Sequence, residues 1–464
     1  MSGLFASLHA SISALSAQSR AVEITGKNLA NVNNPNYARQ RVLIGSLGTI
    51  ITAQGPESMG VTALAVQQMR DALLDNQVLR EVSLTASYSS QQQAYQRAEA
   101  GLGQNIDGAS ATSSTTTDNG VASSIDDFFN AFQSFASDPT DAGQRQTLLQ
   151  KASILVDRIH LADQRLSQVN SDLDSQINTD VTGTNRLLQT VADLNGQIAR
   201  LEINNPGTAV DLRDQRQADL EQLAAKMPVD LRTDPTGKVQ LFGKDTSGAD
   251  VLLVDGSAVQ GPIAFTGTTI TGGASATVLA LNSGSMQGTL AARDGGVKTI
   301  RDNLNQLASQ LVTAVNGAYP AGGFFNAAGT TAATFGLASG LTPTTLKASN
   351  GGSAGDNTVA LAIAQLATQK FTIAGGAAID GTFGGFFSTA VSNLGQAVSG
   401  ATARSTDQTS IENLVRTQRD GVSGVSLDEE TANLLKYQRA FQASSRVFST
   451  IDSLLDNVVN SLGR

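Results

Sequence analysis

Apolar residues recur every seven positions near both ends of the chain. Towards the C-terminus they form a principal row of Leu427, Leu434, Phe441, Phe448, Leu455 and Leu462, and a second row of Tyr437, Ser444, Ile451 and Val458. Positions at i, i+3 and i+7 fall on one narrow face of a helix, as in a coiled coil. Ser426 followed by Glu429 is a capping box, so the pattern predicts a helix that begins at about residue 426.

A second stripe with the same period lies at the N-terminus. Its members are Leu8, Leu15, Val22 and Leu29, with Phe5 and Ile12 in an adjoining row and mainly Ala and Ser between them. A single helix of this kind is marginal in water, because its nucleation is costly. We therefore expect the terminal stripes to pair with each other and with neighbouring copies. The same periodicity also fits an ordinary bundle within one monomer.

Helical patterns interrupted by one β-type segment fill the middle of the chain. Phe128, Phe129, Phe132 and Phe135 form a one-sided stripe that predicts core packing. Heptad spacing from Ile159 to Leu201 predicts a long helical stem. From Pro228 to about Ser285 the apolar period changes to two, with Gly, Asp and Asn at the turns, which predicts strands.

These patterns predict a mainly α fold with a terminal α-helical coiled coil, a long helical-bundle stem and a small inserted β domain. The expected domains are an N-terminal axial helix and extended segment at 1–60 that pairs with the C-terminus, a helical stem at 61–227, the inserted β domain at 228–290, returning stem helices at 291–420 with a Gly- and Thr-rich loop at 319–355, and a C-terminal coiled-coil helix at 421–464.

An asparagine-rich motif follows the first predicted helix. Pro35 cannot continue a helix, so the chain turns there and becomes extended around residues 41–44. The motif positions are Asn28, Asn31, Tyr37, Arg39 and Gln40. They resemble the N-terminal signature of the bacterial flagellar axial proteins of the rod, hook and hook-associated group. Asn36 departs from that signature, where Gly is common, and Asn also tolerates a left-handed turn.

Two further segments extend the resemblance. The run from Leu427 to Glu430 and the run from Tyr437 to Ala443 are similar to the C-terminal signature of the same group. Asp214, Gln215 and Arg216 follow the long helices, as in the hook–filament junction family of hook-associated proteins. The resemblance implies a structural protein that joins hook to filament as a homo-oligomeric ring. Its implied partners are other copies of itself, the hook protein, a second hook–filament junction protein and an export chaperone.

Composition argues against several other classes of function. The formal net charge is −9 with no basic run, so we expect no nucleic-acid partner. The absence of cysteine excludes disulfides and thiolate chemistry. No apolar run reaches the roughly 20 residues of a membrane span, so we expect no membrane insertion. No Sec signal peptide precedes Arg20, and we expect export to the flagellum by another route.

The sequence carries no recognisable catalytic constellation. The chain has two histidines, His9 and His160, which are far apart in the sequence, so it contains no His-Glu-x-x-His metal helix. No nucleophile elbow or phosphate-binding glycine loop occurs. We therefore expect no enzyme activity and no cofactor. The alternatives are a flagellar hook or rod protein, or an enzyme or adhesin on a helical stalk; a majority of helix would favour the junction family over the hook proteins, which are mostly β between their terminal helices.

Overall fold

The computed structural model describes residues 2–52, 55–102, 120–234, 238–320, 322–353 and 355–462. Helix accounts for 63% of the chain, which confirms the mainly α fold. The chain divides into two compact units. Unit 1 contains 1–85, 181–284 and 408–464, and unit 2 contains 86–180 and 285–407. Three long helices contribute residues to both units, namely α2 (Ala72–Leu102), α4 (Ala142–Leu201) and α9 (Phe383–Ser423).

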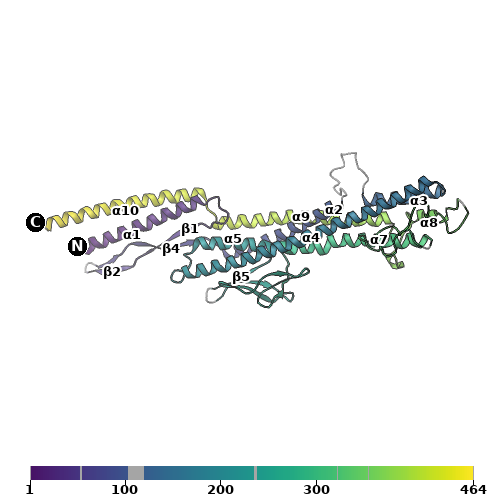
Figure 1. The fold of residues 1–464 in the computed structure, drawn as a ribbon. Helices are drawn as coiled ribbons and strands as arrows, with labels where there is room; N and C mark the ends of the chain where they lie inside the picture. The colour runs from purple at the N-terminus through teal and green to yellow at the C-terminus, as the bar shows by residue number, and fades with distance from the viewer. Residues whose placement is uncertain are drawn as a thin grey trace. The chain divides into compact units, whose positions relative to one another are not determined.

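The two ends of the chain lie together in unit 1. Helix α1 (Ser2–Ala30) packs along helix α10 (Leu427–Leu462), and the two run antiparallel, so both termini lie at the same end (Figure 1). The amide N–H of Glu429 donates to Ser426 Oγ at 3.4 Å, which confirms Ser426 as the residue that caps α10. The predicted pairing of the terminal helices is therefore present within a single chain.

A β-ribbon follows α1 and packs against it. Strand β1 (Gln40–Ser46) pairs antiparallel with β4 (Val61–Gln68), and between them β2 (Thr49–Thr52) pairs with β3 (Gly55–Ser58). The assignment of residues 61–68 to the helical stem was wrong, because this segment is strand β4. The absence of proline after Pro56 suggested helix, but pairing with β1 decides the conformation of this β-branched segment.

The inserted β domain belongs to unit 1. After α5 (Val210–Lys226), a four-stranded antiparallel sheet has the order β5-β6-β7-β8, and a three-stranded sheet has the order β11-β10-β9. Their bounds are Asp230–Thr233, Val239–Lys244, Asp250–Asp255 and Ala258–Val259 for β5 to β8, and Ala264–Phe265, Ile270–Gly272 and Thr277–Val278 for β9 to β11. All seven strands fall within the predicted interval 228–290.

Unit 2 is built around an aromatic core. Its other helices are α3 (Val121–Ser137), α6 (Ser285–Ala292), the π-helix Arg293–Val297, α7 (Lys298–Ala318), α8 (Thr358–Gln365) and the 3₁₀ turn Ile373–Gly375. Phe128, Phe132 and Phe135 are fully buried, as the one-sided stripe predicted. Phe324 and Phe325 of the Gly- and Thr-rich loop pack onto Phe128, with ring centroids 5.7 and 5.6 Å away. That loop therefore contributes to the core.

Candidate assembly interface

The register of α1 against α10 follows from one contact region. Val22 and Phe441 line the same shallow groove between the two helices. Because the helices run antiparallel and seven residues make nearly two full turns, Leu15 lies level with Phe448, and Leu8 with Leu455. The two heptad rows predicted from the sequence therefore match each other step by step.

Pairing covers these rows only in part. Leu8, Leu15, Val22, Leu29, Leu434, Phe448, Ile451 and Leu455 are half-buried. Ile12, Leu427 and Phe441 remain exposed, at 46%, 53% and 40% of their surface. Leu462 lies in α10, but its side chain is outside the described part of the structure. The apolar side chains of α1 that are described as buried are instead Ala17, Ala21 and Ile24, and the two alanines permit close packing.

Sequence periodicity did not identify several exposed apolar side chains. These are Leu435, Val447, Leu454 and Val459 of α10. Phe5 of α1, a member of the adjoining row, is exposed as well. Val447 and Leu454 are seven residues apart, so they share one face of α10. Apolar side chains exposed along one helix face are typical of a surface that binds another protein.

Asn28 lies at the base of the helix pair, where several motif residues meet. Its amide nitrogen donates to Gln40 O at 2.8 Å and to Glu430 Oε2 at 2.9 Å. Its amide oxygen accepts from Tyr37 Oη at 2.8 Å and from Gln40 N at 3.0 Å. Burial, together with the negative charges of nearby carboxylates including Glu430, raises the pKa of the Tyr37 hydroxyl, so Tyr37 acts as a donor at neutral pH.

Arg39 ties the motif to the first turn of α10. Its Nε donates to Glu430 Oε1 at 2.8 Å, and its Nη1 donates to Glu429 Oε2 at 2.7 Å. Its backbone N–H donates to Ser423 O at 2.8 Å. No local pattern reveals this partnership, since about 390 residues separate Arg39 from the two carboxylates.

Asp214 connects the same loop to α5. Its Oδ1 accepts from Arg70 Nη2 at 2.5 Å and from the backbone N–H of Ala38 at 3.3 Å. Arg70 also pairs with Asp75 at 3.2 Å. Burial raises the pKa of both carboxyls, although the Arg70 guanidinium opposes that rise. We call the group of Asn28, Tyr37, Arg39, Arg70, Asp214 and Glu430 the hub.

The remaining motif residues lie around or outside the hub. Gln40 is buried, and its amide nitrogen donates to Asp211 at 3.3 Å. Asn31 donates to Lys27 O in the last turn of α1. Gln215 is exposed. Arg216 points elsewhere: it donates to Asn195 at 2.9 Å, and burial lowers the pKa of its guanidinium to about 10.

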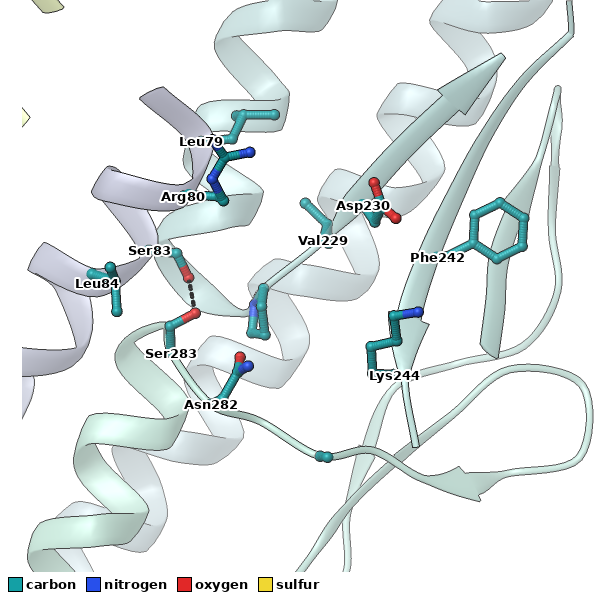
Figure 2. Close-up of a pocket in the computed structure, with 13 residues that line it drawn as sticks. Leu79, Arg80, Ser83, Leu84, Val229, Asp230, Phe242, Lys244, Asn282 and Ser283 are labelled. Carbon is teal, nitrogen blue, oxygen red and sulfur yellow. Dashed lines mark hydrogen bonds between the residues drawn. The ribbon is translucent and has the colours of Figure 1, made fainter. Parts of the chain in front are cut away.

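A cavity of about 400 Å³ lies between α2 and the four-stranded sheet of unit 1 (Figure 2). Its two hydroxyls, Ser83 and Ser283, bond to each other at 2.7 Å, and no histidine lines it. Its charged groups are Arg80, Asp230 and Lys244. Asp230 is paired with Arg232 and Lys244 with Asp250. The cavity therefore contains no activated nucleophile and no general base beside one.

Metal centres and helical membrane spans are two other classes of site that the described residues do not contain. Among them, no cluster of three or more His, Cys, Asp or Glu side chains is arranged to hold a metal ion. Within the same residues, none of the helices combines the length and the hydropathy of a membrane span.

Comparisons with known proteins agree with the motifs. Residues 110–335 match the helical domain of flagellar hook-associated protein FlgK, residues 420–462 match the C-terminal region of the flagellar basal body rod FlgEFG proteins, and residues 8–37 match the flagella basal body rod protein family. The flagellar hook-associated protein 1 of Bacillus subtilis (strain 168) is 24% identical over all of this chain and 99% of its own length.

Two further matches cover less of each protein. The flagellar hook-associated protein 1 of Escherichia coli (strain K12) is 26% identical over 67% of this chain and 56% of its own length. The flagellar hook junction protein FlgK from Burkholderia pseudomallei aligns with a TM-score of 0.45 at 24% identity, over 54% of this chain and 46% of that one.

The order of the matched segments is the order of the motifs that meet in the structure. The rod-type N-terminal match contains the α1 side of the hub, the rod-type C-terminal match contains the α10 side, and the helical domain lies between them. With a relative matched from end to end, the chain belongs to the flagellar hook-associated protein 1 family of hook–filament junction proteins and is a structural component of the flagellum, not an enzyme.

Proposed function

We propose that copies of this chain form a ring in the axial tube between hook and filament, and that the α1–α10 pair is the surface through which each copy meets its neighbours. The observation that carries the proposal is that α1 and α10 leave large apolar side chains exposed after they have paired. A head-to-tail contact between such surfaces generates a ring or a helical tube, according to whether the rotation closes.

The exposed surface is large enough to drive assembly. Among the side chains of the two helices that the structure describes, eight large apolar ones are exposed, namely Phe5, Ile12, Leu427, Leu435, Phe441, Val447, Leu454 and Val459. Full burial of one such side chain stabilises by about 1.5–3 kcal/mol, and covering the half that remains exposed contributes about half of that. The gross gain is on the order of 8 kcal/mol per copy, before the entropy of ordering the side chains is subtracted.

The same surface would meet different partners during export and assembly. The family resemblance supports the hook protein on one side of the ring, a second hook–filament junction protein on the other, and an export chaperone before secretion. Helix α10 packs chiefly against α1, and its first turn is held at the hub. Because its contacts are confined mainly to α1 and the hub, α10 can leave α1 for a chaperone while the rest of unit 1 stays folded. The chain would then pass through type III export without a cleaved Sec signal peptide.

The test replaces one exposed member of the C-terminal row. Phe441→Glu places a charge in the groove beside Val22, so we expect a folded subunit that does not enter the flagellum. Ser453→Glu is the matched control, because Ser453 is exposed on the same helix and bonds only within it, to Ser449 O. Circular dichroism checks that both variants keep their helix content, and motility measures incorporation. Normal motility of Phe441→Glu would count against the proposal.

Electron microscopy of cells that lack the protein separates the junction role from the hook or rod role. A missing junction leaves bare hooks, and flagellin that cannot polymerise on them is secreted into the medium. Absence of the hook itself would instead indicate a hook or rod subunit.

A further inference from the structure

The β-ribbon of unit 1 (β1 with β4 and β2 with β3) carries a second uncovered apolar surface. Its exposed large side chains are Leu43, Ile44, Leu47, Ile51, Met59 and Leu64. Ile51, in strand β2, is 91% exposed, the highest value of any large apolar side chain in the described residues. A two-stranded ribbon is marginally stable alone, and α1 supports only part of this one.

The free strand edges of the ribbon carry little of the usual protection, since Pro56 of β3 is its one proline, and Arg41 of β1 and Glu57 of β3 are its two charged residues. Natural proteins guard such edges with charges, prolines or covering elements, because unpaired backbone groups recruit other chains. Between Arg41 and Arg70 the one charged residue is Glu57. A ribbon so poor in charge is suited to permanent contact with protein.

Helix α1 separates this ribbon from α10. Gly60, at the turn between β3 and β4, approaches α1 so closely that a Cβ there would lie 2.9 Å from Ala10 Cα. Val22 lines the groove with Phe441 of α10. Ala10 and Val22 point about 120° apart around the helix axis, so α1 presents different faces to the ribbon and to α10 (Figure 1). Each chain thus has two distinct uncovered surfaces.

Besides the ribbon, the other uncovered surface is the flank of α10 that bears Val447 and Leu454. Each residue directly precedes a half-buried member of the principal row, Phe448 or Leu455, and so points about 100° away from it. Pairing with α1 leaves Val447 and Leu454 exposed. We call these two residues the α10 flank.

We propose that the ribbon of one copy packs against the α10 flank of the next copy in the ring. This inference rests on the proposed ring and identifies the two surfaces that meet within it. The occupant is a second copy because one rotation brings the two unlike surfaces of neighbouring copies together and leaves neither uncovered. The contact is heterologous, so every copy uses its ribbon towards one neighbour and its α10 flank towards the other.

Cysteine cross-linking tests this arrangement, because the chain contains no cysteine of its own. The variant with both Ile51→Cys and Leu454→Cys, assembled in flagella and treated with a short bis-maleimide, should give a ladder of multimers of this chain. Each single variant should give no ladder. The matched control combines Leu73→Cys with Leu454→Cys, because Leu73 is 80% exposed but lies in α2, outside the ribbon, and should give monomers.

Three results would overturn the inference. In the first, the assembled double variant gives monomers and no multimers. In the second, Ile51→Cys alone gives dimers, which would indicate a ribbon-to-ribbon contact. In the third, the double variant is cross-linked to a different flagellar protein. In all three cases assembly itself has succeeded, so the proposed ring survives. Normal incorporation of Phe441→Glu would instead remove the proposed function, whatever the cross-linking pattern.

A charge substitution gives an independent readout. Ile51→Asp removes almost no packing within the monomer, so its fold should be unchanged, and we expect at least a tenfold loss of incorporation into flagella. Leu73→Asp should incorporate normally. Equal incorporation of the two variants would refute a role for the ribbon in assembly.

Discussion

Glu430 is the residue through which the hub holds α10, so its replacement should release that helix. The side chain is 2% exposed and accepts hydrogen bonds from Asn28 Nδ2 and from Arg39 Nε. Glu430→Ala removes both acceptor oxygens. Asn28 then keeps one donor without its partner, and Arg39 keeps only Glu429, whose side chain is 62% exposed.

The expected magnitude follows from these contacts. Removing one partner of a buried ion pair costs about 3–5 kcal/mol. The cost here lies at the lower end, about 3 kcal/mol, because Arg39 is partly solvated and retains Glu429. An exposed pair contributes less than about 1 kcal/mol, so Glu429→Ala, one residue away, is the matched control.

Hydrogen exchange of the amides in 427–462 is the direct assay. Local opening of α10 should become about a hundredfold more frequent in Glu430→Ala, since 1.4 kcal/mol corresponds to a factor of ten. Exchange in α3 and α7 of unit 2 should not change. In a double-mutant cycle, Arg39→Ala should add little once Glu430 is alanine, because the two residues share one interaction.

The reasoning fails if the two glutamates behave alike. Equal exchange rates in the α10 amides of Glu430→Ala and Glu429→Ala would mean that contact with α1 alone holds α10 and that the hub contributes nothing. Unfolding of the whole chain in Glu430→Ala would mean that α10 is not a separable element, and the proposed release of α10 to a chaperone would then be refuted as well.

Two further predictions concern other parts of the chain. Gly288→Ala should lower the free energy of unfolding by about 2 kcal/mol in thermal denaturation, because the new Cβ would lie 2.0 Å from Ser87 O. Gly317→Ala, whose Cβ would have nothing within 4 Å, should instead raise the free energy of unfolding by up to about 1 kcal/mol. Equal effects of the two substitutions would refute this packing. Burial alone would raise the pKa of Glu202, but hydrogen bonds from Arg213 and the backbone lower it overall. Because the pKa of Glu202 in the folded state lies below the unfolded value of about 4.3, its pair with Arg213 stabilises the fold above that pH, and this contribution is lost as pH falls through the folded pKa. The difference in urea stability between wild type and Glu202→Gln should therefore shrink below pH 4. A difference that stays constant with pH would contradict this prediction.

Periodicity predicted those elements whose packing is repetitive. Helices with one apolar stripe bury that stripe wherever the partner comes from, so the terminal helices and the phenylalanine stripe of α3 could be predicted. The alternating strands of the inserted domain could also be predicted from the sequence, because turn residues separate them. Asp180, an interruption in the stem heptads, is buried and accepts a hydrogen bond from Ser285 at 2.6 Å. Its partner was not predictable from the heptad pattern.

The ribbon and the hub were harder to predict from the sequence, for different physical reasons. Strand β4 has no strict alternation, because β1 shifts register at Leu43 and Ile44, and a helical assignment competes with it. The hub residues other than Arg70 were recognised as parts of sequence motifs, but their partners lie on α2, α5 and α10, which local patterns do not connect. Arg70 and Asp75 were missed altogether, since an isolated Arg and Asp in a helix-rich stretch are usually solvated.

The hub explains why asparagine occupies position 28. A carboxamide supplies two donors and two acceptor lone pairs, and Asn28 uses all four, towards Gln40, Glu430 and Tyr37. Aspartate would lose both donors and place a second negative charge beside buried Glu430, while glutamine would carry the amide one methylene too far. Because that single side chain joins α1, β1 and α10, the two sequence signatures at opposite ends of the chain act as one structural element, which fixes where the terminal helix pair begins.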